Sequence, residues 1–255
     1  MNTLQLTVEN SLPDDWQRAT LVGRVWLPGE QGGPAVVVIR DGEVIDCSAH
    51  FPTLSLLLDT DQPLHRVRDI NGTSLGSVQD LLANSGEQRD PAKPYLLAPT
   101  DLQVIKAAGV TFASSMIERV IEEKAGGDAL RAEEIRALVQ AAIGDNLRDL
   151  KPGSPEAMRL KQVLIEQKMW SQYLEVGIGP DAEIFTKAPI LAAVGSGNAI
   201  GIHPGSSWNN PEPEVVLAVD SHGRIHGATL GNDVNLRDFE GRSALLLSKA
   251  KDNNA

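Results

Sequence analysis

The stretch Trp-Asn-Asn-Pro-Glu-Pro-Glu at residues 208–214, followed further along by Gly-Asn-Asp at residues 231–233, is the most informative part of the chain. Two strand-like segments joined by a turn lie between them, which predicts a hairpin. Glu212 and Glu214 are separated by one residue, so in an extended chain their carboxylates point to the same face. Asp233 follows the second strand and returns to the same edge. Three converging carboxylates predict a site for a divalent cation such as Mg²⁺.

The composition excludes several classes of protein. The chain has 255 residues, enough for one large domain or two, and a formal net charge of −11 with no basic stripe, which argues against a nucleic-acid partner. No apolar run approaches the roughly eighteen residues of a membrane span, and the N-terminus lacks the pattern of a signal peptide. The single Cys47 excludes an internal disulfide and is interpreted as core packing. We therefore expect a cytoplasmic protein.

The N-terminal part of the chain is predicted to be rich in β-strands. Residues 21–27 and 35–40 have strand patterns, and Asp41-Gly42 between apolar runs predicts a hairpin that continues into residues 43–46. The polar, proline-containing stretch 85–94 is interpreted as a linker. We therefore expect a small β-rich N-terminal domain over residues 1–90 and a second domain over residues 91–255.

The middle of the chain is predicted to be helical. Residues 115–124 and 132–143 carry apolar side chains at helical spacing. A further helix is expected over residues 155–173, with Ser154 as its N-cap, and Trp170 near its end is interpreted as core packing.

Short strands are expected in the last part of the chain, where glycine and proline become frequent. The strand-like segments are residues 183–187, 215–220 and 225–230, with a turn at residues 221–224. The last two strands form the hairpin that would bring the three carboxylates together.

At the acidic motif the chain resembles the fumarylacetoacetate hydrolase superfamily. The shared pattern is Glu-x-Glu, a hairpin, Gly-Asn-Asp and an arginine four residues after the aspartate, here Glu212, Glu214, Asp233 and Arg237. The resemblance runs from about residue 97 to the C-terminus and is closest to the branch of sugar-acid dehydratases. The segments that carry this closer likeness are residues 108–112, 169–176 and 179–187. It implies an α+β fold, in which a mixed β-sheet roll or barrel forms the C-terminal domain beside the small β-rich N-terminal domain.

The resemblance also implies a set of functional residues. Glu212, Glu214 and Asp233 are expected to hold Mg²⁺, with Mn²⁺ or Ca²⁺ as alternatives. Lys251 matches a lysine that neighbours the metal in the family, and Lys249 is the other possible register. Members of the family usually continue past this lysine with strands that complete the fold, whereas this sequence ends at Ala255, so a catalytic domain truncated at its C-terminus is one expectation.

One departure from the family distinguishes its chemical branches. Where the C–C hydrolases have an aspartate and a water-activating histidine, this chain has Thr111 and Glu118. An imidazole is the usual base at neutral pH, so its absence argues against hydrolysis, and a carboxylate suits proton transfer during elimination. Glu118 is therefore the candidate general acid or base, beside Lys251 and Arg237 as catalytic cations.

The expected reaction is the Mg²⁺-dependent dehydration of a 2-keto-3-deoxy sugar acid. A pentonate of the D-xylonate type would lose a proton from C3 and the C4 hydroxyl as water, giving 2,5-dioxopentanoate in pentose catabolism. Family members commonly form dimers or tetramers. The expected substrate-binding residues are Thr111, Ser114, Lys187, His203 and Asn232.

Two other classes of function remain open at this point. A relative within the family could cleave a C–C bond of a 2-keto acid as a hydrolase or a decarboxylase. The chain could also be a non-catalytic binding protein or an inactive fragment that keeps the fold.

Overall fold

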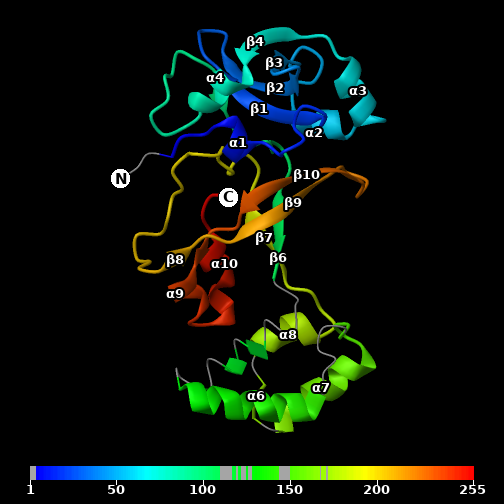
Figure 1. The fold of residues 1–255 in the computed structure, drawn as a ribbon, viewed down its shortest axis with the longest axis vertical. Coiled ribbons are helices and arrows are strands. Elements are labelled where there is room, and N and C mark those ends of the chain that lie inside the picture. Colours follow the sequence, from blue (N-terminus) through cyan, green and yellow to red (C-terminus); the bar gives the residue numbers. More distant parts are fainter. Residues whose placement is uncertain are drawn as a thin grey trace. The chain divides into compact units, whose positions relative to one another are not determined.

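The computed structural model describes residues 4–109, 117–118, 120–121, 125, 128–143, 150–166, 168–170 and 172–255. Its contacts divide the chain into two compact units (Figure 1): unit 1 comprises Met1–Ile105 with Thr186–Ala255, and unit 2 comprises Lys106–Phe185. The strands β6 (Ile105–Ala108) and β7 (Ile184–Ala188) pair with each other, and the division crosses both.

The first part of unit 1 is a five-stranded antiparallel sheet in the order β4-β3-β2-β1-β5. Its strands are β1 (Leu21–Leu27), β2 (Gly33–Arg40), β3 (Glu43–Asp46), β4 (Thr73–Ser77) and β5 (Tyr95–Leu96). The predicted Asp-Gly hairpin is confirmed: Asp41 and Gly42 both have positive φ angles, 51° and 81°, as a two-residue hairpin turn requires.

Both faces of this sheet are covered. Successive side chains of β2 point to opposite faces, and each face packs against different helices. Ala35 and Val37 pack with Val78 and Leu81 of helix α4 (Val78–Ala83). Val36 and Val38 belong to a second cluster on helices α2 (Leu54–Leu58) and α3 (Pro63–Asp69). The predicted packing role of Cys47 is confirmed, since its side chain is buried in the second cluster. A short helix, α1 (Val8–Ser11), precedes the sheet.

The stretch 85–94, which the sequence suggested as a linker, is an ordered loop. The side-chain amide of Asn84 donates hydrogen bonds to the carbonyls of Asp90 and Pro94, and Ser85 is fully buried. A single side chain therefore ties both ends of the loop together.

Unit 2 is helical. Its helices are α6 (Ala129–Ile143), α7 (Pro155–Glu166) and α8 (Gln172–Ile178), and Ile117, Glu118, Val120, Ile121 and Ala125 also have helical geometry. Ser154 caps α7 as predicted, since its hydroxyl accepts a hydrogen bond from the backbone N–H of Ala157.

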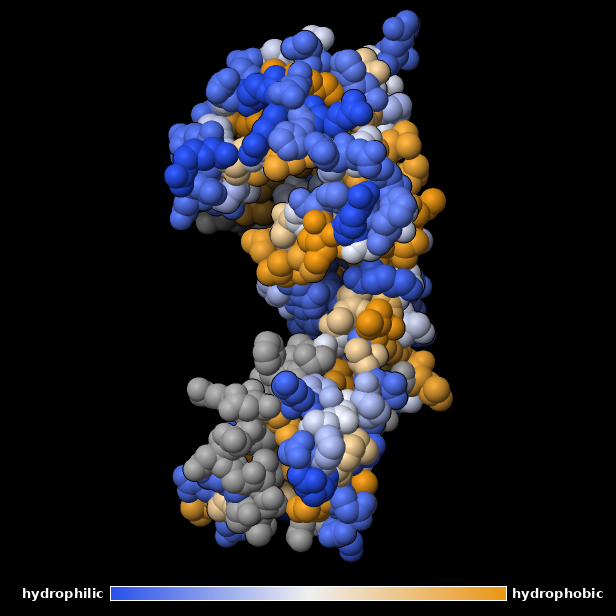
Figure 2. All heavy atoms as spheres, turned by 90° about the vertical axis from the view of Figure 1, so that its right-hand side faces the viewer, coloured by the Kyte–Doolittle hydropathy of each residue, from blue (hydrophilic) through white to orange (hydrophobic). Residues whose placement is uncertain are grey.

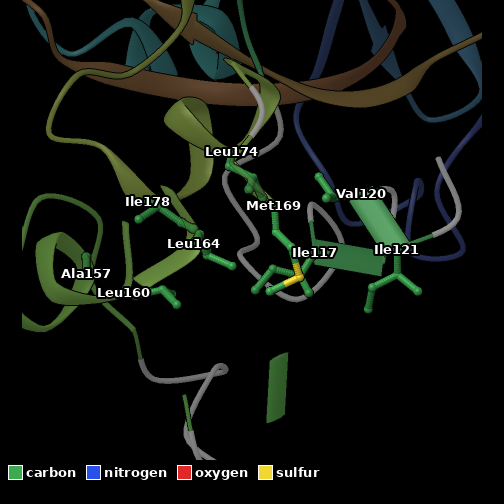
Figure 3. Packing of buried hydrophobic residues seen from close by; sticks show 9 residues of the cluster. All are labelled: Ile117, Val120, Ile121, Ala157, Leu160, Leu164, Met169, Leu174 and Ile178. Atoms are coloured by element: carbon green, nitrogen blue, oxygen red, sulfur yellow. The ribbon is translucent and has the colours of Figure 1, made fainter. Parts of the chain in front are cut away.

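The prediction of one continuous helix over residues 155–173 was wrong. The chain turns at Lys168, which has a φ of 56°, and the N–H groups of Met169 and Trp170 both bond to the carbonyl of Leu164. This turn allows Met169 to enter the apolar cluster of unit 2, where Figure 3 shows it reaching toward Ile117. Trp170 packs against the same cluster, as expected.

The rest of unit 1 contains the hairpin that the sequence predicted. Strands β9 (Pro213–Val219) and β10 (Ile225–Asn232) are antiparallel neighbours (Figure 1). The other elements are β8 (Asn209–Asn210), β11 (Asn235–Leu236), α9 (Arg237–Glu240), a 3₁₀ turn η2 (Ala244–Leu246) and α10 (Leu247–Lys251). The molecule is thus a mixed α/β protein with antiparallel pairing in its main sheet and hairpin.

The two faces of the β9–β10 hairpin differ in exposure. Alternate residues of β9 are exposed, among them Val215 and Leu217, and their cross-strand partners include the exposed Leu230. Apolar side chains are visible on the surface presented in Figure 2. Glu214 lies on the other, more covered face. In the part of the chain that is described, no helix is long and apolar enough to cross a membrane.

The helical packing of unit 2 can be tested on α7. We expect Leu164→Ala to lower the free energy of unfolding by about 3 kcal/mol, because Leu164 is only 1 % exposed and its loss leaves a cavity. Met158→Ala on the same helix removes a side chain that is 40 % exposed and should cost less than about 1 kcal/mol. Urea unfolding measures both; equal losses would contradict the described orientation of α7.

Candidate metal and substrate site

The β9–β10 hairpin brings the two glutamates and the aspartate to one end of the ribbon. Glu214 pairs with Gly231 across the strands, and the next pair, Pro213 with Asn232, links the ends of β9 and β10. The backbone N–H of Asp233 donates to the carbonyl of Glu212 at 3.0 Å, which extends the ladder by one step. Backbone pairing therefore fixes the places from which all three carboxylates project.

The three carboxylates form a compact cluster. One oxygen from each of Glu212, Glu214 and Asp233 lies within 4.8 Å of the others, with Asp233 buried and the two glutamates half-buried. Burial raises the pKa of Asp233, and burial together with the neighbouring Asp233 and Glu212 raises the pKa of Glu214. The negative charges of these acids lie close together and repel one another. A bound cation would reduce that repulsion.

A buried lysine supplies part of the compensating charge. Nζ of Lys251 donates to Oε2 of Glu212 at 2.6 Å and to Oδ2 of Asp233 at 2.9 Å. Burial by itself lowers the pKa of a lysine, but these two hydrogen bonds outweigh it and raise the pKa of Lys251. Lys251 is therefore a fixed positive charge at neutral pH.

Helix α10 presents Lys251 to the acids because its other face is anchored by apolar packing. Ala250 is fully buried against Leu236 of β11 and Phe239 of α9. Lys249, the other possible register, lies with its Nζ 5.0 Å from the centre of the Phe239 ring. Of these two lysines, Lys251 is the one that hydrogen-bonds to the carboxylates.

Two further residues of the site were not found from the sequence. The amide of Asn235 is completely buried and donates to Oε1 of Glu212 at 3.1 Å and to Oε2 of Glu240 at 2.6 Å. Burial raises the pKa of Glu240, but hydrogen bonds from Asn235 and Arg237 outweigh it and lower that pKa. The signal was present in the spacing: Asn235 is two residues after Asp233, so in an extended segment the two side chains share a face.

The donor set fits a divalent cation. Oδ1 of Asp233 is buried and, among the described residues, accepts no hydrogen bond. An unpaired buried carboxylate oxygen is costly unless a cation or a donor faces it. Together with the carboxylate oxygens of Glu212 and Glu214, it gives the all-oxygen ligand set that Mg²⁺ and Ca²⁺ take.

Lys187 is a second buried ammonium group beside the cluster. Its Nζ lies 3.9 Å from Oδ1 of Asp233, and its side chain is 1 % exposed. Burial lowers the pKa of Lys187 to about 8, although Asp233 acts in the opposite direction. Its hydrogen bonds go to Lys251, the last residue of α10, and to Asn253 and Asn254 after the helix.

The other residues singled out in the sequence lie as follows. Arg237 donates to Glu240 at 2.8 Å, and Asn232 accepts the backbone N–H of Glu212 at 2.9 Å. His203 is exposed, packs edge-on against Phe239 and accepts the N–H of Gly205. Thr111 and Ser114 lie outside the described residues.

Glu118, the candidate base, belongs to unit 2. Its carboxylate forms a two-bond ion pair with Arg136, at 3.0 and 2.8 Å, and its side chain is half exposed. The hydrogen bond with Arg136 lowers the pKa of Glu118. The group is therefore ionised at neutral pH.

A second group of possible metal ligands, Asp59, Asp220 and His222, lies at the turn of the hairpin. Asp220 is already satisfied, since it accepts hydrogen bonds from Arg224, His226 and the backbone of His222. Burial alone would raise the pKa of Asp220, but these bonds hold it well below its ordinary value. This group stabilises the turn, and we assign it no metal.

Comparison with known proteins confirms that parts of the chain resemble 2-keto-3-deoxypentonate dehydratases, as the sequence suggested. The chain is 44 % identical over 69 residues to 2-dehydro-3-deoxy-D-arabinonate dehydratase of Saccharolobus solfataricus, covering 27 % of this chain and 23 % of that protein. It is 40 % identical over 86 residues to the probable 2-keto-3-deoxyxylonate dehydratase of Haloferax volcanii, covering 34 % and 29 %. The matched segments thus span less than a third of either relative. No protein-family model matches the chain.

Solved structures support the fold. A 2-keto-3-deoxy-D-arabinonate dehydratase complexed with magnesium and 2,5-dioxopentanoate superposes with a TM-score of 0.52 at 20 % identity, over 90 % of this chain and 60 % of that one. The apo form of that enzyme gives the same values. At this level of identity the likeness concerns the fold.

The crowding of the acids has a measurable cost. Because the pKa of Glu214 is raised in the folded state, its ionisation lowers stability, and this loss grows as the pH rises from the unfolded value near 4.5 through the folded pKa. We expect Glu214→Gln to stabilise the metal-free protein at pH 7.5 by up to about 1 kcal/mol, a gain that shrinks toward pH 4.5. Urea unfolding in EDTA measures it. A less stable variant at pH 7.5 would show that the cluster is not strained.

The same cluster predicts cation binding. We expect Glu214→Gln and Asp233→Asn each to weaken Mg²⁺ binding at least about tenfold, because each removes an ionised oxygen ligand. Isothermal titration calorimetry measures the affinity. Glu166→Gln makes the same change of charge on the exposed surface of α7 and should leave the affinity unchanged. Unchanged binding in both site variants would refute the metal site.

Proposed function

We propose that this protein is a Mg²⁺-dependent dehydratase of a 2-keto-3-deoxypentonate, with 2-keto-3-deoxy-D-xylonate as the expected substrate, and that its product is 2,5-dioxopentanoate. The observation that carries the proposal is the cluster of three carboxylates within 4.8 Å, joined to the ammonium of Lys251. The dehydratase names of the two relatives support the choice of reaction.

The residues present would hold the metal and the substrate in complementary ways. Glu212, Glu214 and Asp233 would bind Mg²⁺, which when bound supplies Lewis-acid stabilisation to a 2-keto acid. Lys251 keeps its proton at neutral pH, because the two carboxylates raise its pKa. Its role would be electrostatic: an ammonium beside the substrate's carboxylate favours the negative charge that develops when a C3 proton leaves.

The proton would be moved by Glu118, as the sequence suggested. Arg136 holds Glu118 in its ionised form, which is the form that a base requires. The same ion pair makes the carboxylate a weaker base, so the proposal requires the substrate's C3 proton to be made more acidic by the polarised carbonyl. Arg237 remains our candidate for a second catalytic cation, and Thr111, Ser114, His203 and Asn232 remain candidates for contacts with the substrate.

The wider setting of the enzyme is proposed on the same basis. The catalytic domain would form the mixed β-sheet roll of the family over residues 91–255, with residues 1–90 as the smaller domain. We propose a homodimer or homotetramer in the cytoplasm, acting in pentose catabolism. The acidic net charge of −11 and the single cysteine agree with that compartment.

Activity can be measured directly. We expect 2-keto-3-deoxypentonates to be converted to the semialdehyde in the presence of Mg²⁺, as followed with an NAD(P)-coupled dehydrogenase, and the rate to fall to background in EDTA. Lys251→Met should lower kcat at least about a hundredfold, because a charge that stabilises the transition state is lost. Absence of any signal above the EDTA control would defeat the dehydratase proposal, and formation of pyruvate would favour C–C cleavage.

A further inference from the structure

Lys187 presents an unusual use of a buried charge. Its ammonium group has three N–H donors, and four acceptors surround it: the carbonyl of Lys251 at 3.0 Å, the carbonyl and side-chain oxygen of Asn253 at 2.9 and 2.8 Å, and the carbonyl of Asn254 at 3.3 Å. All of them belong to the segment in which α10 ends. The donors of Lys187 are therefore directed to the chain itself.

This contact joins two parts of the chain that are distant in sequence. Lys187 lies in β7, whereas its acceptors lie in the last residue of α10 and in the residues that follow it, and the last carbonyls of a helix have no partner within the helix. A cation at such carbonyls is favourable, and burial strengthens the interaction. The side chain of Lys187 in β7 thus supplies hydrogen-bond donors to the carbonyls of Lys251, Asn253 and Asn254.

Other bonds hold the same segment in place. The amide of Asn254 donates to the carbonyl of Ala192 at 2.7 Å and accepts the N–H of Gly201 at 3.0 Å. Asn253 donates to the carbonyl of Ala250 at 3.2 Å. These hydrogen bonds join neutral groups, whereas Lys187 is the buried, charged donor to the same segment.

The backbone that Lys187 holds carries the cation of the site. Lys251 is bound at both ends: its carbonyl accepts from Lys187, and its ammonium donates to Glu212 and Asp233. A lysine side chain has four rotatable bonds, so its head is fixed only if its backbone is fixed too.

We propose that Lys187 is a positioning residue: it clamps residues 251–254 so that the ammonium of Lys251 stays between Glu212 and Asp233. This role differs from the substrate contact expected from the sequence, because the donors of Lys187 are engaged with the chain. The catalytic consequence rests on the proposed function, whereas the placement of Lys251 does not.

The placement can be measured without substrate or metal. Hydrogen-bonded, buried lysine ammonium groups exchange slowly and give ¹H–¹⁵N signals. We expect the Lys251 signal in the unmodified protein, and an exchange rate at least about fivefold faster in Lys187→Met, because the segment opens more often. Lys249→Met, the same change on the exposed side of α10, should leave that signal unchanged.

A second variant guards against misfolding. Asn253→Ala removes one acceptor of Lys187 and keeps the lysine, so we expect a smaller increase in the exchange of the Lys251 ammonium. If the Lys251 signal is the same in Lys187→Met and Asn253→Ala as in the unmodified protein, the clamp is refuted.

Kinetics separate positioning from substrate binding. We expect Lys187→Met to lower kcat about tenfold with KM within twofold, and to have little further effect when Lys251→Met is already present. A raised KM with unchanged kcat would make Lys187 a substrate ligand and overturn the proposal. Faster exchange with unchanged kinetics would overturn the catalytic consequence of the clamp. If the unmodified protein has no dehydratase activity, the proposed function fails, and the exchange measurement still decides the clamp.

Discussion

The site depends on one electrostatic constraint: three carboxylates are held within 4.8 Å of one another by backbone pairing. Burial, with mutual repulsion as a smaller cause, disfavours the ionised state and raises the pKa of Glu214 and Asp233. Lys251 and, at 3.9 Å, Lys187 offset part of this charge, and Oδ1 of Asp233 accepts no hydrogen bond among the described residues. A cluster of three acids that remains short of positive charge is suited to a divalent cation.

Local patterns in the sequence were sufficient to predict the β9–β10 hairpin and the positions of the three carboxylates at one end of it. Alternating apolar residues and a turn define β9 and β10, and pairing then determines which acids share an edge. The turn at Lys168 could not be predicted, because a positive φ at a lysine is set by the packing of Met169 and not by local propensity. Tertiary contacts decided that segment.

The environment of the site was harder to predict than its acids. Asn235 could have been found from its two-residue spacing to Asp233, but the partners of Lys187 lie more than sixty residues away in the chain. No local periodicity encodes such a contact. The sequence could therefore indicate which residues carry charge, but not that one buried lysine supports the backbone of another.

The central claim is that the carboxylates of Glu212, Glu214 and Asp233 together bind one divalent cation. Anomalous diffraction from crystals soaked with Mn²⁺ tests it most directly, since the ion can be located without reference to activity. We predict a single strong peak in contact with all three carboxylates. A peak at Asp59 and Asp220 instead, or none at the hairpin acids, would contradict the assignment.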